Sequence, residues 1–144
     1  MATKLGNDYR LWVEGATAGT YAMILGQQDL KYSRKATTID TSTKDNAPYA
    51  TAAAGLFQIS ITLNGIAQFP DATGFSQVET NFKAQISTNF QIRKGGAGGV
   101  SPGDVVFACK MNILELSTDF GQNKPLSYVM GLDLSTAPTV DTLA

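Results

Sequence analysis

The residues of this sequence that could bind a metal ion or catalyse a reaction are few. The chain has no histidine and a single cysteine, Cys109, so the commonest general base and the commonest metal ligand are both missing. The segment DTSTKDN, residues 40–46, offers oxygen ligands of the kind used in calcium loops. However, Lys44 stands where a ligand is needed, and no bidentate glutamate follows at the required spacing. We therefore expect no metal, no cofactor and no catalytic residue.

Four further patterns are candidate functional sites, and three of them have a simpler structural interpretation. The glycine-rich stretch KGGAGGVSPG, residues 94–103, lacks a Gly-Lys-Ser/Thr ending and leads into a strand, which favours a hairpin tip over a phosphate loop. Cys109 lies in VVFACKM, a setting typical of a small buried side chain. A carboxylate pair for glycoside hydrolysis stays open, although no pair is singled out by its position. Aromatic residues that could form a sugar-binding platform lie mostly at alternating strand positions, which favours a core role: Trp12, Tyr21, Tyr32 and Phe57.

Composition indicates one domain spanning residues 1–144. Hydrophobic residues make up 43% and charged residues only 16%, with a net charge of −1. So few charges suggest that part of the surface does not face water in the working state. Basic residues are scattered, so we expect no tight grip on nucleic acid. The start has no apolar run of signal-peptide length and no segment is long enough to span a bilayer, so we expect a cytoplasmic protein without a membrane anchor.

Most of the chain has the period-two alternation of β-strands. It predicts strands at residues 9–13, 21–25, 30–39, 57–64, 89–93, 104–118 and 127–134. In the strand of residues 57–64, Phe57, Ile59, Ile61 and Leu63 share an apolar face, and the opposite face is polar and uncharged: Gln58, Ser60, Thr62 and Asn64. In the strand of residues 104–118 the alternation changes phase at Leu114, which predicts either a bulge or two ends buried on opposite sides.

One amphipathic helix is predicted at residues 74–86. Its apolar stripe is Phe75, Val78, Phe82 and Ile86, and Ser76 with Glu79 matches a capping box. The stripe is expected to be the helix's core face, packed across one side of the β-structure. The predicted fold is mainly β (α+β): a β-sandwich or partly closed barrel with one amphipathic helix.

The least regular stretch is TIDTSTKDNAPYATAAAG, residues 38–55. It predicts a long loop at about residues 40–55, built from small and polar residues with few bulky anchors. Loops of such length in compact domains are usually functional or disordered. We expect this loop to be mobile in a free subunit and ordered by a neighbouring copy. The tail STAPTVDTLA, about residues 135–144, is expected to be a loose arm.

The order of these segments resembles the major tail protein, or tail tube protein, of long-tailed, siphovirus-like bacteriophages. The resemblance rests on Gly6-Asn7-Asp8 before the first strand, on the run from Ile39 to Thr43, and on SITLNG, Ser60 to Gly65. It covers nearly the whole chain in element order. The chain departs from many relatives at Pro48, Tyr49 and residues 52–54, where those relatives carry a tryptophan and charged residues.

The resemblance implies a structural role without enzyme activity. Six-membered rings would stack into a hollow tube, with strands of each copy joining a ring-wide inner β-barrel and the helix outside it. Such a tube belongs to the tail of the virion, is assembled in the host cytoplasm, and lets DNA pass from capsid to host without tight binding. Implied partners besides other copies are the tape measure protein, the tail terminator and the distal tail protein.

The resemblance also implies roles for particular residues. The long loop would contact the adjacent ring through Asp40, Thr41, Ser42, Thr43, Lys44, Asp45, Asn46, Pro48 and Tyr49. Polar strand residues would face the lumen or the exterior: Gln58, Ser60, Thr62, Asn64, Lys110 and Asn112. Two alternatives stay open at this point. One is a secretion-tube or baseplate ring protein of the same fold, and the other is a monomeric carbohydrate-binding β-sandwich module.

Overall fold

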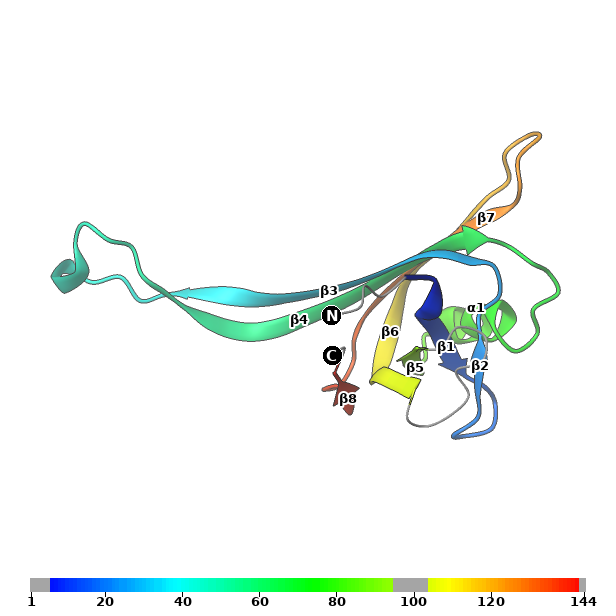
Figure 1. Ribbon diagram of the computed structural model, residues 1–144, viewed down its shortest axis with the longest axis horizontal. Coiled ribbons are helices and arrows are strands. Elements are labelled where there is room, and N and C mark those ends of the chain that lie inside the picture. Colours follow the sequence, from blue (N-terminus) through cyan, green and yellow to red (C-terminus); the bar gives the residue numbers. More distant parts are fainter. Residues whose placement is uncertain (1–5, 95–103, 143–144) are drawn as a thin grey trace.

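A computed structural model of the chain describes residues 6–94 and 104–142 (Figure 1). Within them, eight strands form one antiparallel sheet in the order β2-β1-β5-β6-β7-β4-β3, with β8 beside β6. The elements in chain order are η1 (Gly6–Asp8), β1 (Arg10–Glu14), β2 (Tyr21–Met23), β3 (Gln27–Asp40), η2 (Lys44–Asn46), β4 (Ala52–Ile66), α1 (Phe75–Ala84), β5 (Thr88–Arg93), β6 (Val105–Asp119), β7 (Ser127–Leu134) and β8 (Val140–Asp141). The mainly β fold with one α-helix in this part of the chain confirms the predicted class.

The sheet curls toward a barrel but does not close. Where β1 and β3 approach, no ladder forms, and the side chain of Gln27 joins them instead. Its Oε1 accepts a hydrogen bond from the Leu11 N–H at 2.9 Å, and its Nε2 donates to the backbone oxygens of Leu11 and Ile24, both at 2.8 Å. The amide therefore satisfies backbone groups that a closing strand would otherwise pair.

The core lies inside this curl, on the face where α1 packs. It contains apolar residues from β1, β4, β5, β6, β7 and the helix, including Leu11, Ile61, Val78, Phe107 and Met130, none of which is exposed. The helix contributes Phe75, whose ring lies 5.4 Å from that of Tyr128 on β7. Alternation along β4 and β7 separates this buried face from the polar face on the other side of the sheet, whereas β1 and the first half of β6 are buried on both faces.

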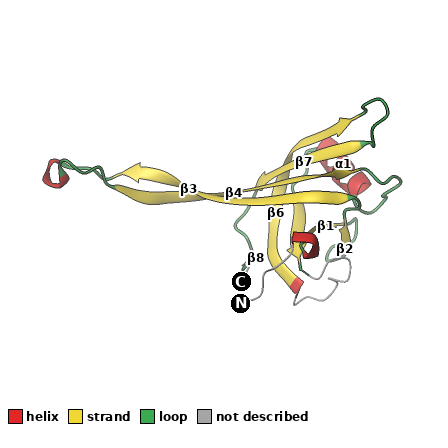
Figure 2. Ribbon diagram, turned by 45° about the horizontal axis from the view of Figure 1, so that its top comes forward, coloured by secondary structure: helices red, strands yellow, loops and turns green. Residues whose placement is uncertain are grey.

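The most unusual feature of the fold is a long two-stranded projection, which we call the arm and define as residues 36–57. β3 and β4 leave the body together and stay paired, with Ala36 opposite Phe57 and Asp40 opposite Ala52 (Figures 1 and 2). The predicted loop at residues 40–55 is therefore wrong in its bounds: the unpaired connection is residues 41–51. Small residues carry the strand here because a ladder needs only backbone groups, and β3 supplies the partner.

The predicted helix needs two corrections. Gln85 takes the left-handed conformation with φ of 56° and ends the helix at Ala84, so Ile86 lies outside it and is 56% exposed. Phe75 and Val78 are buried, and Phe82 is half-buried. The expected core face therefore holds for the first turns and fails at Ile86.

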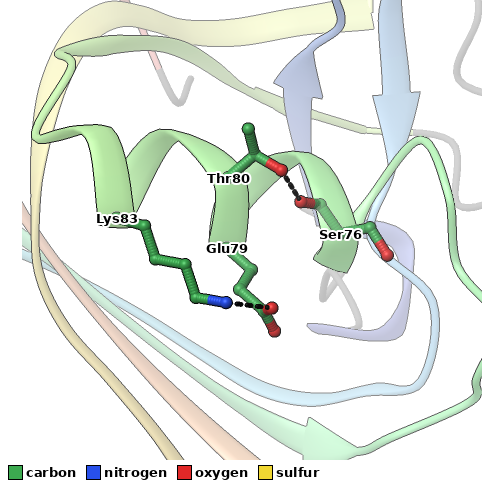
Figure 3. Close-up of polar contacts among 4 residues, drawn as sticks. All are labelled: Ser76, Glu79, Thr80 and Lys83. Atoms are coloured by element: carbon green, nitrogen blue, oxygen red, sulfur yellow. Dashed lines mark hydrogen bonds and ion pairs between the residues drawn. The ribbon is translucent and has the colours of Figure 1, made fainter.

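The expected capping box is also absent, because the helix starts one residue before Ser76. Ser76 instead accepts a hydrogen bond at its backbone oxygen from Thr80 Oγ1 at 2.9 Å, and Glu79 pairs with Lys83 at 3.0 Å on the exposed side (Figure 3). The buried Asp71 caps the helix. Its Oδ1 accepts from the Gly74 N–H at 3.1 Å, and its Oδ2 accepts from the Phe75 N–H at 3.0 Å.

The phase change in β6 is a bulge. The register with β7 shifts between Ile113 and Glu115, so Leu114 is the extra residue and is 64% exposed. Beyond it Leu116 returns to the core side, where it packs against the buried cluster. Of the two predicted alternatives, the bulge is confirmed.

Two other expectations concern the remaining segments. The expected loose arm at residues 135–144 includes a short strand, because Val140 and Asp141 of β8 pair with Ala108 and Phe107 of β6. The glycine-rich connection lies almost entirely in residues 95–103, outside the described part of the chain.

Candidate functional site

The tip of the arm is a turn closed by its own hydrogen bonds. The Thr41 N–H donates to the Thr51 oxygen at 3.1 Å, and the Thr51 N–H donates to Ser42 Oγ at 2.8 Å. Ser42 also donates its N–H to Asp40 Oδ1 at 2.9 Å, and this bond lowers the pKa of the Asp40 carboxyl. The two strand ends are thus held together by their own hydroxyl, carboxyl and backbone groups.

The sequence-predicted loop residues all lie at the end of the arm, away from the body (Figure 1). Asp40 ends β3, Lys44, Asp45 and Asn46 form η2, and Thr41, Ser42, Thr43, Pro48 and Tyr49 lie in the connection. Every one of these side chains is exposed, Tyr49 to 76%. The structure therefore gathers them on one projecting tip.

Apolar side chains along the arm were not among the predicted site residues. Leu56 is 82% exposed, Phe57 76% and Ile39 54%. Phe57 was expected on the buried face, but the arm has left the body there, so its side chain has no core to enter. The adjacent pair Leu56-Phe57 puts a large apolar side chain on each face of one strand, and that pattern was the available signal.

The predicted polar face is a continuous surface of four strands, in the order β3, β4, β7 and β6. Cross-strand pairs put Ser60 beside Asp133, and Asp133 beside Asn112. The next row holds Thr62, Gly131 and Glu115. This register places the predicted residues on the same side of the sheet, opposite the helix: Gln58, Ser60, Thr62, Asn64, Lys110 and Asn112.

Charges on this polar face are mixed. The same registers place the lysines Lys31, Lys35 and Lys110 there within the body. Carboxylates on the described strands of this face outnumber them: Asp29, Glu115, Asp119 and Asp133. In the part of the chain that the structure describes, the face therefore carries no basic patch that would hold phosphate groups.

The four-stranded layer has an unpaired edge on each side in the described residues. β3 ends the strand order and pairs with β4 alone. On the opposite side, β5 accompanies β6 only as far as Met111, which leaves the outer edge of β6 open from Asn112 to Asp119. Exposed edges of this length are aggregation hazards in a monomer unless another chain covers them.

The end of the molecule opposite the arm also exposes large apolar side chains. The hairpin that joins β6 and β7 projects on the far side of the body from the arm (Figures 1 and 2). Phe120, at its turn, is 79% exposed, and Phe69, in the connection before α1, is 51% exposed. Apolar residues at two different ends suit head-to-tail contacts between copies better than a symmetric dimer.

The aromatic residues considered for sugar binding do not form an exposed platform. Trp12 is buried on the face of β1 opposite Leu11 and Val13. The Arg93 guanidinium carbon lies 4.6 Å from the centre of the Trp12 ring and 5.5 Å from the centre of the Tyr21 ring. The Tyr32 ring packs 5.0 Å from Phe107. Among the four candidates only Phe57 is exposed.

No group of three or more histidine, cysteine or carboxylate side chains lies close enough to hold a metal ion within residues 6–94 and 104–142. The α-helix in that part of the chain is too short to cross a bilayer.

Solved structures share this fold. A subunit of the tail of an empty gene transfer agent particle, refined with C6 symmetry, superposes with a TM-score of 0.81 at 17% identity, over 97% of this chain and 100% of that chain. A subunit of the SPP1 tail tube gives 0.73 at 12% identity, over 96% and 81%. A chain of the six-fold symmetrised baseplate of the anti-feeding prophage gives 0.64 at 12% identity, over 99% and 100%.

Sequence comparison identifies the family. No curated protein matches the chain. The model of the phage tail tube protein family matches residues 3–139, which include the arm, the polar sheet face and both unpaired edges. The chain therefore belongs to the phage tail tube protein family.

Proposed function

We propose that this protein is the non-enzymatic subunit of a phage tail tube, forming six-membered rings that stack into a hollow conduit for DNA. The observation that carries the proposal is the four-stranded layer with its two open edges. β3 and β6 run antiparallel to each other across this layer, because each neighbouring pair in it is antiparallel. The open edge of β3 in one copy can therefore continue the antiparallel sheet at the open edge of β6 in the next.

Repetition of this pairing gives a closed inner barrel. Head-to-tail contacts close into a ring when the rotation between copies is a whole fraction of a turn. Six copies are favoured because the similar gene transfer agent tail has C6 symmetry. Closure would also cover both edges of every copy and so remove the aggregation hazard.

The polar face is the lumen face in this proposal. Helix α1 packs on the other face, so only the polar face is bare enough to line a channel. Its excess of carboxylates over lysines repels the DNA backbone, so DNA would pass without being held. Of the two orientations that the sequence left open, the proposal therefore takes the lumen for these residues: Gln58, Ser60, Thr62, Asn64, Lys110 and Asn112.

The arm serves contact between rings in this proposal. Its tip lies beyond the body and exposes Tyr49 together with small residues that allow close approach of another surface. Contacts between successive rings do not close, so they propagate the tube. The expected partners at the tube's ends and inside it are the tail terminator, the distal tail protein and the tape measure protein, which the family resemblance implies.

Electron microscopy of the purified protein tests the proposal. The expected result is hollow tubes with six-fold symmetry, formed at high concentration or with the tape measure protein. Discrete rings that never stack under either condition would contradict it. They would favour the second candidate, a baseplate or secretion-tube ring protein, which the shared fold with the anti-feeding prophage baseplate supports.

A further inference from the structure

The C-terminal residues 135–142, which we call the strap, lie along the first half of β6. The N–H groups of Ser135, Thr139 and Thr142 donate to backbone oxygens of β6 at 3.0, 2.8 and 2.9 Å. β7 pairs with β6 only from Met111 onward. The strap therefore occupies the part of the β6 edge that β7 leaves uncovered.

The strap is joined to the base of the arm by one polar cluster. Asp141 Oδ1 accepts a hydrogen bond from the Tyr32 hydroxyl at 2.6 Å, and the same oxygen lies 3.5 Å from Arg34 Nη1. Both partners belong to β3. Arg34 pairs with Ile59, the last buried residue of β4 before the arm, since Phe57 beyond it is exposed. The cluster thus lies where the arm leaves the body.

An open groove of about 670 Å³ separates the strap from the arm, lined by Ala36 and Phe57 on the arm side and by Ala137 and Pro138 on the strap side. Strand β8 itself has only two ladder pairs, and both its residues are exposed. A segment with few buried contacts and a short ladder opens locally at low free-energy cost.

The only cysteine of the chain lies beneath the strap. Cys109 is 4% exposed, and its thiol lies 3.1 Å from the Thr136 backbone oxygen. Burial raises the pKa of this thiol. Because the strap covers the sulfur, a reagent can reach it only when the strap opens or the whole subunit unfolds.

We propose that the strap holds the arm in a fixed direction relative to the body and can detach from β3. The contacts of the Asp141 carboxylate with Tyr32 and Arg34, which we call the catch, hold the strap in place. When the catch is closed, β6 and the base of β3 are joined across the groove. When it opens, the arm keeps its ladder and its place in the sheet but loses the polar contact between β3 and the strap. The consequence for tube growth rests on the proposed function, whereas the tie itself is a property of the free subunit.

Thiol labelling of the free subunit tests the catch. Asp141→Ala removes the acceptor and the negative charge, and Tyr32→Phe removes the donor alone. Loss of one such hydrogen bond is expected to raise the labelling rate of Cys109 by about tenfold in each variant. Asp119→Ala makes the same change at the other end of β6 and should label at the wild-type rate. Thermal unfolding of each variant checks that the body stays folded.

Two labelling outcomes would contradict the proposal that the Asp141 contacts hold the strap in place. The first is an unchanged rate in both catch variants. The second is a wild-type labelling rate with the same steep denaturant dependence as global unfolding, because the thiol would then be reached only through the unfolded state.

The arm's direction is measured separately. Spin labels at Asn46→Cys and Thr80→Cys, in a Cys109→Ala background, report the distance between arm tip and helix. Asp141→Ala should broaden the distance distribution relative to Asp119→Ala, and equal distributions would refute the claim that the strap fixes the arm. If the wild-type protein forms no tubes, the proposed function is wrong. The labelling rate and the spin-label distances would still test the proposed role of the strap, because both are measured on the free subunit. If tubes form, Asp141→Ala should slow their growth.

Discussion

The carboxylate of Asp71 accepts a hydrogen bond from the backbone N–H of Leu25 at 3.1 Å. Leu25 lies in the connection between β2 and β3, and the same carboxylate caps α1 at Gly74 and Phe75. One buried side chain therefore ties the helix terminus to the start of the strand that becomes the arm. Tyr128 completes this junction by donating its hydroxyl to the Leu25 oxygen at 3.0 Å.

Replacing Asp71 is expected to destabilise the subunit strongly. Asp71→Ala leaves the N–H groups of Gly74, Phe75 and Leu25 without this acceptor in a buried setting, a loss of about 3 kcal/mol in the free energy of unfolding. Glu79→Ala is the control, since Glu79 forms only a surface pair with Lys83 and should cost at most about 0.5 kcal/mol. Urea denaturation measures both values. Similar losses for the two variants would disprove the capping role of Asp71.

Alkaline pH is expected to weaken the same junction. Burial and the neighbouring Asp71 raise the pKa of Tyr128 to about 12 from 10.0. A folded-state pKa above the unfolded value stabilises the fold at pH below 10, and this contribution is lost as pH rises from 10 to 12. The free energy of unfolding should fall over that range. In Tyr128→Phe the free energy of unfolding should fall less steeply over this range. If the pH profiles of the variant and the wild type are identical, titration of Tyr128 is not the cause of the fall.

The arm tip is expected to be dispensable for folding and necessary for tubes. Residues 42–50 can be replaced by Asn-Gly, a two-residue hairpin turn compatible with paired strands. Because these residues are exposed and form their hydrogen bonds within residues 40–51, the thermal midpoint should stay near the wild-type value. Electron microscopy should then find no tubes. Normal tubes from this variant would remove the arm tip from the contact between rings.

Ordering of the tip by a neighbour remains a prediction of its own. The tip turn is closed by Thr41, Ser42 and Thr51, but Lys44 to Tyr49 beyond them are exposed. Limited proteolysis should cut this stretch in the free subunit and spare it in tubes, because the adjacent ring would cover it. Equal cleavage in both states would contradict the prediction.

Sequence patterns predicted those parts of the fold in which burial follows a simple period. The alternation of Ile59, Ile61 and Leu63 identified the core side of β4, and the phase change at Leu114 marked the position of the bulge while leaving one alternative open. These succeed because a buried face constrains every second residue.

Patterns failed where the deciding partner is distant in sequence. Ala52 to Gly55 form strand only because β3 supplies a ladder, and no local propensity indicates it. The helix cap was assigned to Ser76 because a capping box is local, whereas Asp71 acts across a connection and also holds Leu25. The catch joins Tyr32 to Asp141 across most of the chain, so no spacing rule could have found it.

The orientation of the polar face in the tube is open to a direct test. Thr62→Lys adds one cation per copy to the polar face, where Thr62 is exposed beside Gly131. Thr80→Lys adds the same charge to the exposed side of α1, outside the proposed barrel. If the polar face lines the lumen, tubes of the first variant should slow DNA passage during ejection at low salt, and added salt should restore the rate by screening phosphate contacts. Tubes of the second variant should pass DNA at the wild-type rate. Slowed passage in Thr80→Lys alone would place the helix side toward the lumen and reverse the proposed orientation.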